Sequence, residues 1–96
     1  MSYQFDPDWV IAPGETLREW LDTNGLSNRV AAAAVGRTAI AWAEAVIDEV
    51  LRREPLTENY ARVLERVTGI PARMWLALEH NYRVGLAAGK HDETDG

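Results

Sequence analysis

Between residues 27 and 53 the sequence reads SNRVAAAAVGRTAIAWAEAVIDEVLRR, and this stretch contains two helical patterns separated by a single glycine, Gly36. The pattern before Gly36 is short and includes four consecutive alanines, which let another helix approach closely. The pattern after Gly36 is longer and amphipathic, because apolar residues at 100° steps fill about half of a helix circumference. The stretch therefore predicts a short helix, a tight turn and a longer second helix.

Three further helices are predicted around this pair. Residues 15–24 form one that ends at Gly25, and a second follows Thr57 and ends at Gly69. A third begins near Pro71, whose missing N–H costs nothing in a first helical turn. We expect hydroxyl N-caps from Ser27, Thr38 and Thr57. The apolar faces of these three helices predict core positions at Leu17, Trp20, Leu21, Leu64, Val67, Trp75, Leu78, Tyr82 and Leu86.

The pattern contains no strand, so it predicts an all-α fold class in a single domain of 96 residues. The two central helices have the outline of a helix-turn-helix. Residues 1–13 have two prolines and no periodicity, which predicts an N-terminal arm. Residues 14–88 form the compact five-helix domain, and residues 89–96, GKHDETDG, predict a disordered acidic tail.

Charge and composition narrow the class of protein. The net charge is −5, but five of the fifteen acidic residues lie at positions 6, 8, 92, 93 and 95, so residues 9–90 are neutral overall. Charge therefore argues neither for nor against nucleic acid. The chain has no cysteine, no apolar run of the roughly 18 residues that a membrane helix needs, and no basic signal-peptide start. We expect a cytoplasmic protein without a membrane segment.

Enzyme chemistry finds little support in the sequence. The two histidines, His80 and His91, lack the spacing of a metal site, and Gly85 and Gly89 do not form a phosphate-binding loop. The carboxylates of Glu44 and other acids on the same helix lack a predicted pocket. We expect no catalytic residue, no metal, no cofactor and no small-molecule substrate.

Several short blocks point to one family. They are DWV at residues 8–10, PGETL at 13–17, GLS at 25–27, LT at 56–57 and GIPARMWL at 69–76. In combination, over residues 8–84, the chain resembles the HigA-type antitoxin branch of the lambda-repressor-like (Xre) helix-turn-helix family. The resemblance implies a compact lambda-repressor-like domain that forms a homodimer and places its third helix in the major groove of operator DNA. It also implies a transcriptional regulator that represses its own operon as an antitoxin, with a RelE-type toxin as the partner of many members.

The same resemblance, together with the basic residues of the motif, assigns candidate DNA contacts. Phosphate contacts are expected from Ser27, Asn28, Arg29, Arg52 and Arg53, and base or groove contacts from Arg37, Thr38 and Ala41. The arginines can pair with phosphate, whereas the outward alanines offer methyl groups. DNA contact is therefore expected mainly from the two ends of the second helix.

The second helix departs from the family pattern. Residues 37–54 exceed the expected length by about four residues, or about one helical turn, and Arg53 stands near the glycine that usually ends this helix. Its outward face carries three acids, Glu44, Asp48 and Glu49, which oppose attraction to phosphate. Alternatively these acids form a solvated face, in which Asp48 pairs with Arg52 and Glu49 with Arg53.

Trp42 and Val46 make the apolar arc of this helix wider than one core contact needs. They have three interpretations: extra core, a face that contacts a second copy or a partner, or insertion into a groove. The alternative function is accordingly a protein-interaction module derived from a helix-turn-helix, which neutralises a toxin or binds a repressor and has lost DNA readout.

Overall fold

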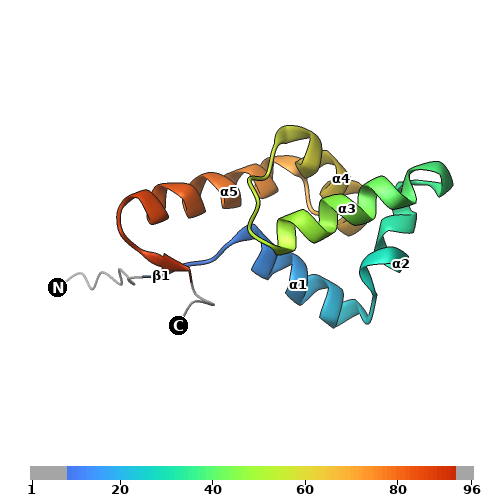
Figure 1. Cartoon of the computed structure of the whole chain (residues 1–96), viewed down its shortest axis with the longest axis horizontal. Coiled ribbons are helices and arrows are strands. Elements are labelled where there is room, and N and C mark those ends of the chain that lie inside the picture. The colour runs from blue at the N-terminus through green and yellow to red at the C-terminus, as the bar shows by residue number, and fades with distance from the viewer. Residues whose placement is uncertain (1–8, 93–96) are drawn as a thin grey trace.

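The computed structural model describes residues 9–92 as a mainly helical molecule, which confirms the predicted all-α class. Figure 1 shows the elements in chain order. The α-helices are α1 (Pro13–Asn24), α2 (Asn28–Ala32), α3 (Ile40–Leu51), α4 (Glu58–Thr68) and α5 (Ala72–Ala87). Two 3₁₀ turns, η1 (Ala33–Val35) and η2 (Arg37–Ala39), join α2 to α3, and two short strands are β1 (Trp9–Val10) and β2 (His91–Asp92).

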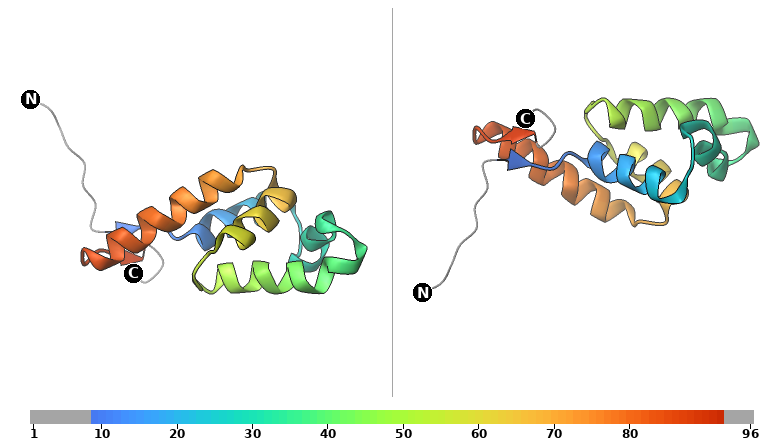
Figure 2. Two further views of the ribbon diagram at one scale, coloured as in Figure 1. Left: turned by 90° about the horizontal axis from the view of Figure 1, so that it is seen from above. Right: turned by 90° about the horizontal axis from the view of Figure 1, so that it is seen from below.

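The helices form layers around one core. In both views of Figure 2, α1 and α4 lie between α3 and α5. Side chains from all five helices meet in this core, and the largest fully buried ones are Trp75, Leu17, Leu21, Ile47, Leu64, Val46 and Val50. The predicted core positions on α1, α4 and α5 are buried or partly buried as expected. Burial of these apolar side chains is the main stabilising contribution of such a domain.

Most predicted helix ends are confirmed by their caps. Ser27 Oγ accepts a hydrogen bond from the backbone N–H of Val30 at 3.2 Å, and Thr57 Oγ1 accepts one from Tyr60 at 3.2 Å. Gly25 and Gly69 end their helices with φ of 65° and 81°, in the left-handed region that glycine tolerates.

The predicted cap at Thr38 is wrong. Gly36 has φ 124° and ψ 153°, and the chain then makes the 3₁₀ turn η2 before α3 begins at Ile40. Ala39 therefore holds the N-cap position of α3, and no side chain caps this end.

The two ends of the described chain are joined, which corrects the predicted arm and tail. β1 pairs in parallel with β2, with Trp9 beside His91 and Val10 beside Asp92. Residues 89–92 are thus part of the folded structure, and Pro13 already belongs to α1. Gly85 on α5 allows this arrangement, since a Cβ there would collide with Cγ1 of Val10. The remaining parts of both predictions, residues 1–8 and 93–96, lie outside the described residues.

A second glycine sets the distance between α1 and α3. Gly14 lies in the first turn of α1, and a Cβ at this position would collide with the backbone carbonyl oxygen of Val50. A backbone atom in a helix cannot yield as the end of a flexible side chain does. The start of α1 is therefore held tightly against the end of α3. None of the described helices is long and apolar enough to cross a membrane.

Candidate nucleic-acid interface

The helix α3 presents a buried side and an exposed side. Ala43, Val46, Ile47 and Val50 face the core, whereas Ala41, Trp42, Ala45 and Arg52 are exposed. Val46 is only 1% exposed, so its predicted place on a partner face is wrong: its side chain belongs to the core. Trp42 is 51% exposed and remains available at the surface. The two residues lie about one turn apart, but only Trp42 stays outside the core.

Two of the acids on α3 are held by α2, and not by α3 itself. Asn28 Nδ2 donates to Asp48 Oδ1 at 2.6 Å, and Arg29 lies 3.3 Å from Glu44 Oε1. Both contacts cross between the helices, because α2 packs directly on α3. Arg29 thus offsets the charge of Glu44, whereas the neutral amide of Asn28 gives Asp48 a hydrogen bond and leaves its charge in place. The two side chains of α2 that were predicted to contact phosphate also serve to hold α3 in place.

The third acid, Glu49, is held by α4. The hydroxyl of Tyr60 donates to Glu49 Oε1 at 2.8 Å, and this hydrogen bond to the carboxylate raises the pKa of Tyr60 above its usual value. The predicted pairs Asp48–Arg52 and Glu49–Arg53 are therefore replaced by contacts to other elements. Sequence periodicity along one helix could not indicate these partners, since they come from α2 and α4.

Arg53 stands at the centre of an ion-pair network where the end of α3 meets α1 and β2. Its Nε donates to Asp92 Oδ2 and its Nη2 to Glu15 Oε2, both at 3.1 Å, and Nη1 donates to the carbonyl oxygen of Leu51 at 2.9 Å. The hydrogen bond to Asp92 is the largest cause of the raised pKa of Arg53. Its backbone φ is 67°, so it adopts the left-handed conformation that glycine favours at a helix end.

The assignment of Arg53 as a phosphate contact is therefore corrected. Its guanidinium donates to two carboxylates and a backbone carbonyl, and its side chain is only 25% exposed. Arg83 on α5 further fixes the same segment by donating from Nη2 to the carbonyl oxygen of Arg53 at 2.8 Å. The physical reason is the burial of Asp92, which is 5% exposed and needs a cationic partner.

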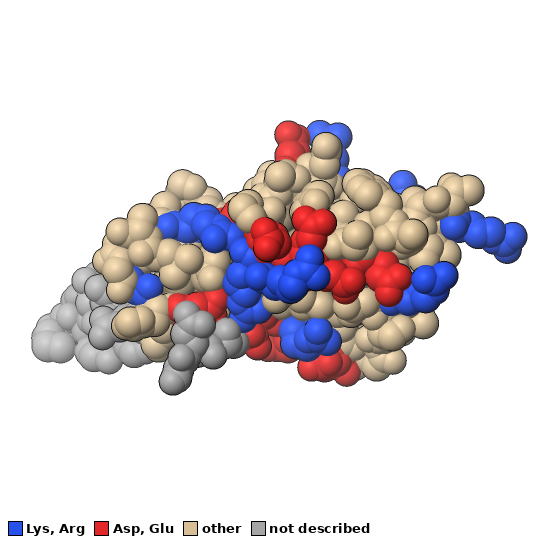
Figure 3. All heavy atoms as spheres, in the orientation of Figure 1, with Lys and Arg blue, Asp and Glu red and all other residues tan. Residues whose placement is uncertain are grey.

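The other predicted contact residues stay at the surface. Ser27, Arg29, Arg37, Thr38, Ala41 and Arg52 are all exposed, and Asn28 is partly buried. Arg37 precedes α3 and Arg52 follows it. Figure 3 shows acidic and basic side chains intermixed across the middle of this face of the molecule. The structure thus keeps two exposed arginines at opposite ends of the predicted reading helix.

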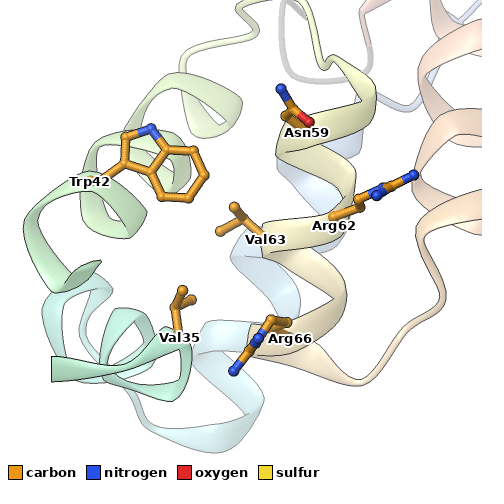
Figure 4. A pocket seen from close by; sticks show the side chains of 6 residues that line it. All are labelled: Val35, Trp42, Asn59, Arg62, Val63 and Arg66. Atoms are coloured by element: carbon orange, nitrogen blue, oxygen red, sulfur yellow. The ribbon is translucent and has the colours of Figure 1, made fainter. Parts of the chain in front are cut away.

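A groove between α3 and α4 was not predicted from the sequence. Figure 4 shows Trp42 and Val63 pointing toward one another across it, with Val35 beside them. Its volume is about 430 Å³, and its lining residues are Val35, Trp42, Asn59, Arg62, Val63 and Arg66. The lining comes from η1, α3 and α4, so no local pattern brings it together. The surplus of apolar surface at Trp42 was its only signal in the sequence.

Within residues 9–92 no group of three or more His, Cys, Asp or Glu side chains is placed to hold a metal ion. His80 is exposed on α5, and His91 is exposed on β2. Comparisons of the chain with models of protein families, with curated proteins and with solved structures returned no match. The family resemblance therefore stays a prediction that rests on the sequence blocks.

Proposed function

We propose that this protein is a DNA-binding transcriptional regulator that inserts α3 into the major groove of its operator. By the resemblance of its sequence blocks, it acts as an antitoxin-like homodimer in the cytoplasm, represses its own operon and has a RelE-type toxin as partner. α2 packs on α3 and holds it through the Asn28–Asp48 and Arg29–Glu44 contacts. An α-helix supported in this way fits the width of the groove.

The observation that carries this proposal is the placement of Arg37 and Arg52 at opposite ends of α3. Arg37 lies in the 3₁₀ turn just before α3, and Arg52 directly follows the twelve residues of this helix, which span about 18 Å. With α3 in a major groove about 12 Å wide, we expect Arg52 to contact phosphate at one end of the helix and Arg37 to enter the groove at the other. Of the acids between them, Glu44 pairs with Arg29, which weakens its repulsion of phosphate, whereas Asp48 and Glu49 accept hydrogen bonds from Asn28 and Tyr60 and keep their charge.

The remaining candidates divide into positioning and reading roles. Ser27 is an exposed hydroxyl residue that can donate to phosphate oxygens, and the exposed hydroxyl of Thr38 is expected to contact base edges or the groove. Ala41 lies on the exposed side of α3, where its methyl group suits contact with the C5-methyl group of thymine. Because no long polar side chain other than Arg52 lies on this exposed side, readout is expected to rely on Arg37 and on shape.

A binding experiment with labelled duplex from the region upstream of the gene tests this proposal. The double variant Arg37→Ala/Arg52→Ala is expected to bind at least about tenfold more weakly and to reduce the slope of log K against log salt by about 2. The matched control is Arg18→Ala/Arg73→Ala, which removes two exposed arginines from α1 and α5. Equal affinity of the two double variants, or no binding of the wild type at 50 mM salt, contradicts the proposal.

A second candidate function is favoured by Trp42. This large side chain is 51% exposed and lines the groove between α3 and α4, as expected of an anchor in a protein interface. The protein would then act as an interaction module, with a toxin, a repressor or a second copy as its partner. Sedimentation of wild type and Trp42→Ala at micromolar concentration identifies self-association, since only a dimer that uses Trp42 loses mass with this substitution.

A further inference from the structure

The groove between α3 and α4 has an apolar floor that is open to solvent. Trp42 lies across from Val63, and Val35 closes the end near η1 (Figure 4). Val63 is 5% exposed and joins the groove to the core, while Trp42 is mainly exposed. A volume of about 430 Å³ accommodates one or two large apolar side chains. The shape therefore suits an anchor residue that is inserted from outside.

The rim of the groove is positively charged. Arg62 and Arg66 lie one turn apart on α4, and none of the lining residues is acidic. Arg66 is exposed, and no described side chain forms a salt bridge with it. Arg62 pairs with Glu58 at 2.9 Å, but both side chains are more than two-thirds exposed, so this pair contributes little and is readily exchanged. The rim thus favours a ligand that brings its own carboxylates.

These two features distinguish a peptide from a nucleic acid as the occupant. The outer surface of a DNA duplex is dominated by charged phosphates, with its bases stacked inside, so it offers little apolar surface to place against Val35, Trp42 and Val63. A helical or extended peptide fills the floor with an apolar anchor and pairs Asp or Glu with the arginines. Only a ligand with both chemistries uses the whole lining.

We infer that this groove docks an acidic amphipathic segment of a partner protein, with a leucine or aromatic anchor against Trp42 and Val63 and carboxylates against Arg62 and Arg66. This inference deepens the second candidate function and rests on it. It is independent of the DNA contacts of Arg37 and Arg52, which lie outside the lining. Trp42 packs against the apolar anchor of the ligand, and the two arginines favour ligands that carry acidic side chains over ligands that carry basic ones.

The probe for this site is a fluorescein-labelled amphipathic helical peptide with leucines at positions i, i+3 and i+7 and glutamates at the flanking positions. The matched probe carries lysines in place of the glutamates. Fluorescence anisotropy with the full chain is expected to give an affinity for the acidic peptide at least about tenfold higher than for the basic one. Equal affinity for the two peptides, or no binding of either at 100 μM protein, overturns the inference.

Three variants locate the binding. Trp42→Ala is expected to weaken binding of the acidic peptide about tenfold, while Met74→Ala, an equally exposed apolar residue on α5, leaves it unchanged. The charge reversal Arg62→Glu/Arg66→Glu is expected to make the basic peptide the tighter ligand. Both arginines are exposed, so this variant stays informative if Trp42→Ala fails to fold. An unchanged preference in the reversed variant places the peptide elsewhere and overturns the inference.

Two other occupants have their own signatures. If a second copy fills the groove, the wild type sediments as a dimer, Trp42→Ala sediments as a monomer, and neither peptide binds. If DNA fills it, Arg62→Glu/Arg66→Glu loses duplex binding as strongly as Arg37→Ala/Arg52→Ala, and neither peptide binds. Either result overturns the peptide inference. The variant Arg37→Ala/Arg52→Ala tests the two sites independently. If it loses duplex binding but still binds the acidic peptide, the groove and the proposed DNA contacts are separate sites.

Discussion

Arg53 and Asp92 are 39 residues apart in the sequence, yet Arg53 Nε donates to Asp92 Oδ2 at 3.1 Å. The same carboxylate oxygen accepts the hydroxyl hydrogen of Tyr82 at 2.6 Å. Asp92 is almost fully buried, and it therefore connects the end of α3, the middle of α5 and the strand β2. This relationship explains why the last described residues belong to the fold.

Asp92→Asn is expected to lower the free energy of unfolding by about 1–3 kcal/mol, because it removes the buried charge that partners Arg53. The expected loss of stability is smaller than the roughly 3–5 kcal/mol that breaking a buried salt bridge can cost, because Glu15 still pairs with the guanidinium group of Arg53. Urea denaturation followed by circular dichroism measures the change. The control Asp22→Asn removes an exposed i,i+4 partner of Arg18 and is expected to cost under about 0.5 kcal/mol. Equal effects of the two substitutions contradict this account.

Two substitutions at Arg53 distinguish the effect of its backbone conformation on stability from the effect of its side-chain ion pairs. Arg53→Ala and Arg53→Gly both remove the ion pairs, but only glycine adopts a φ of 67° without strain. Arg53→Gly is therefore expected to be more stable than Arg53→Ala by about 1 kcal/mol, although both are less stable than the wild type. Thermal and urea unfolding of the three proteins measure this order. An alanine variant as stable as the glycine variant disagrees with a left-handed residue 53.

Alkaline pH is expected to destabilise the fold through Tyr82. Burial, with a smaller contribution from the hydrogen bond to Asp92, raises the pKa of Tyr82 to about 12 from an ordinary value of 10. The folded state holds this proton more tightly than the unfolded state. The protonated hydroxyl of Tyr82 thus contributes about 2–3 kcal/mol to the free energy of unfolding. This contribution is fully present below pH 10 and is lost as the pH rises through 12.

The variant Tyr82→Phe isolates this effect, because phenylalanine has no proton to lose. At pH 8 the wild type is expected to be more stable by about 1–3 kcal/mol, since the variant leaves Asp92 with one donor fewer. This gap is expected to shrink as the pH is raised from 10 to 12. Urea midpoints of both proteins across this range provide the measurement, and a gap that does not change with pH rules out the assignment to Tyr82.

Glu44→Gln is expected to increase affinity for the upstream duplex by about three- to tenfold. The substitution removes one negative charge from α3 and releases Arg29, whose side chain now lies 3.3 Å from that carboxylate, for contact with phosphate. Anisotropy titrations at two salt concentrations measure the change. Glu19→Gln, which removes an exposed acid from α1, provides the control and is expected to have little effect. A weaker duplex affinity in Glu44→Gln argues against α3 as the reading helix.

Local chemistry made much of the helical framework predictable. Ser27 and Thr57 cap α2 and α4, and Gly25 and Gly69 end α1 and α4, because each acts within a few residues of its own position. The burial of Trp75 and Leu64 followed from the same helical periodicity. Thr38 failed as a cap because a second 3₁₀ turn follows Gly36, and this turn geometry has no distinct sequence signal.

The candidate site was less predictable than the framework. Arg37 and Arg52 are exposed as expected, whereas Arg53 forms salt bridges with Glu15 and Asp92. The sequence contained each of these residues, but their pairing depends on how α1, α3 and β2 meet in space. A periodicity of 3.6 residues reports the face of one helix only, and it carries no information on which charges from other elements lie opposite.

The sequence by itself determined an all-α chain in which Gly25 and Gly69 end α1 and α4 and Ser27 and Thr57 cap α2 and α4, since those effects act over one turn. Only the tertiary structure decided which charged side chains form ion pairs or hydrogen bonds within the fold and which remain exposed to solvent. Burial of Asp92 required Arg53, and the packing of α2 and α4 on α3 brought Asn28 and Tyr60 to its acids. The physical reason is that desolvation and ion pairing depend on distances between elements, which no local pattern fixes.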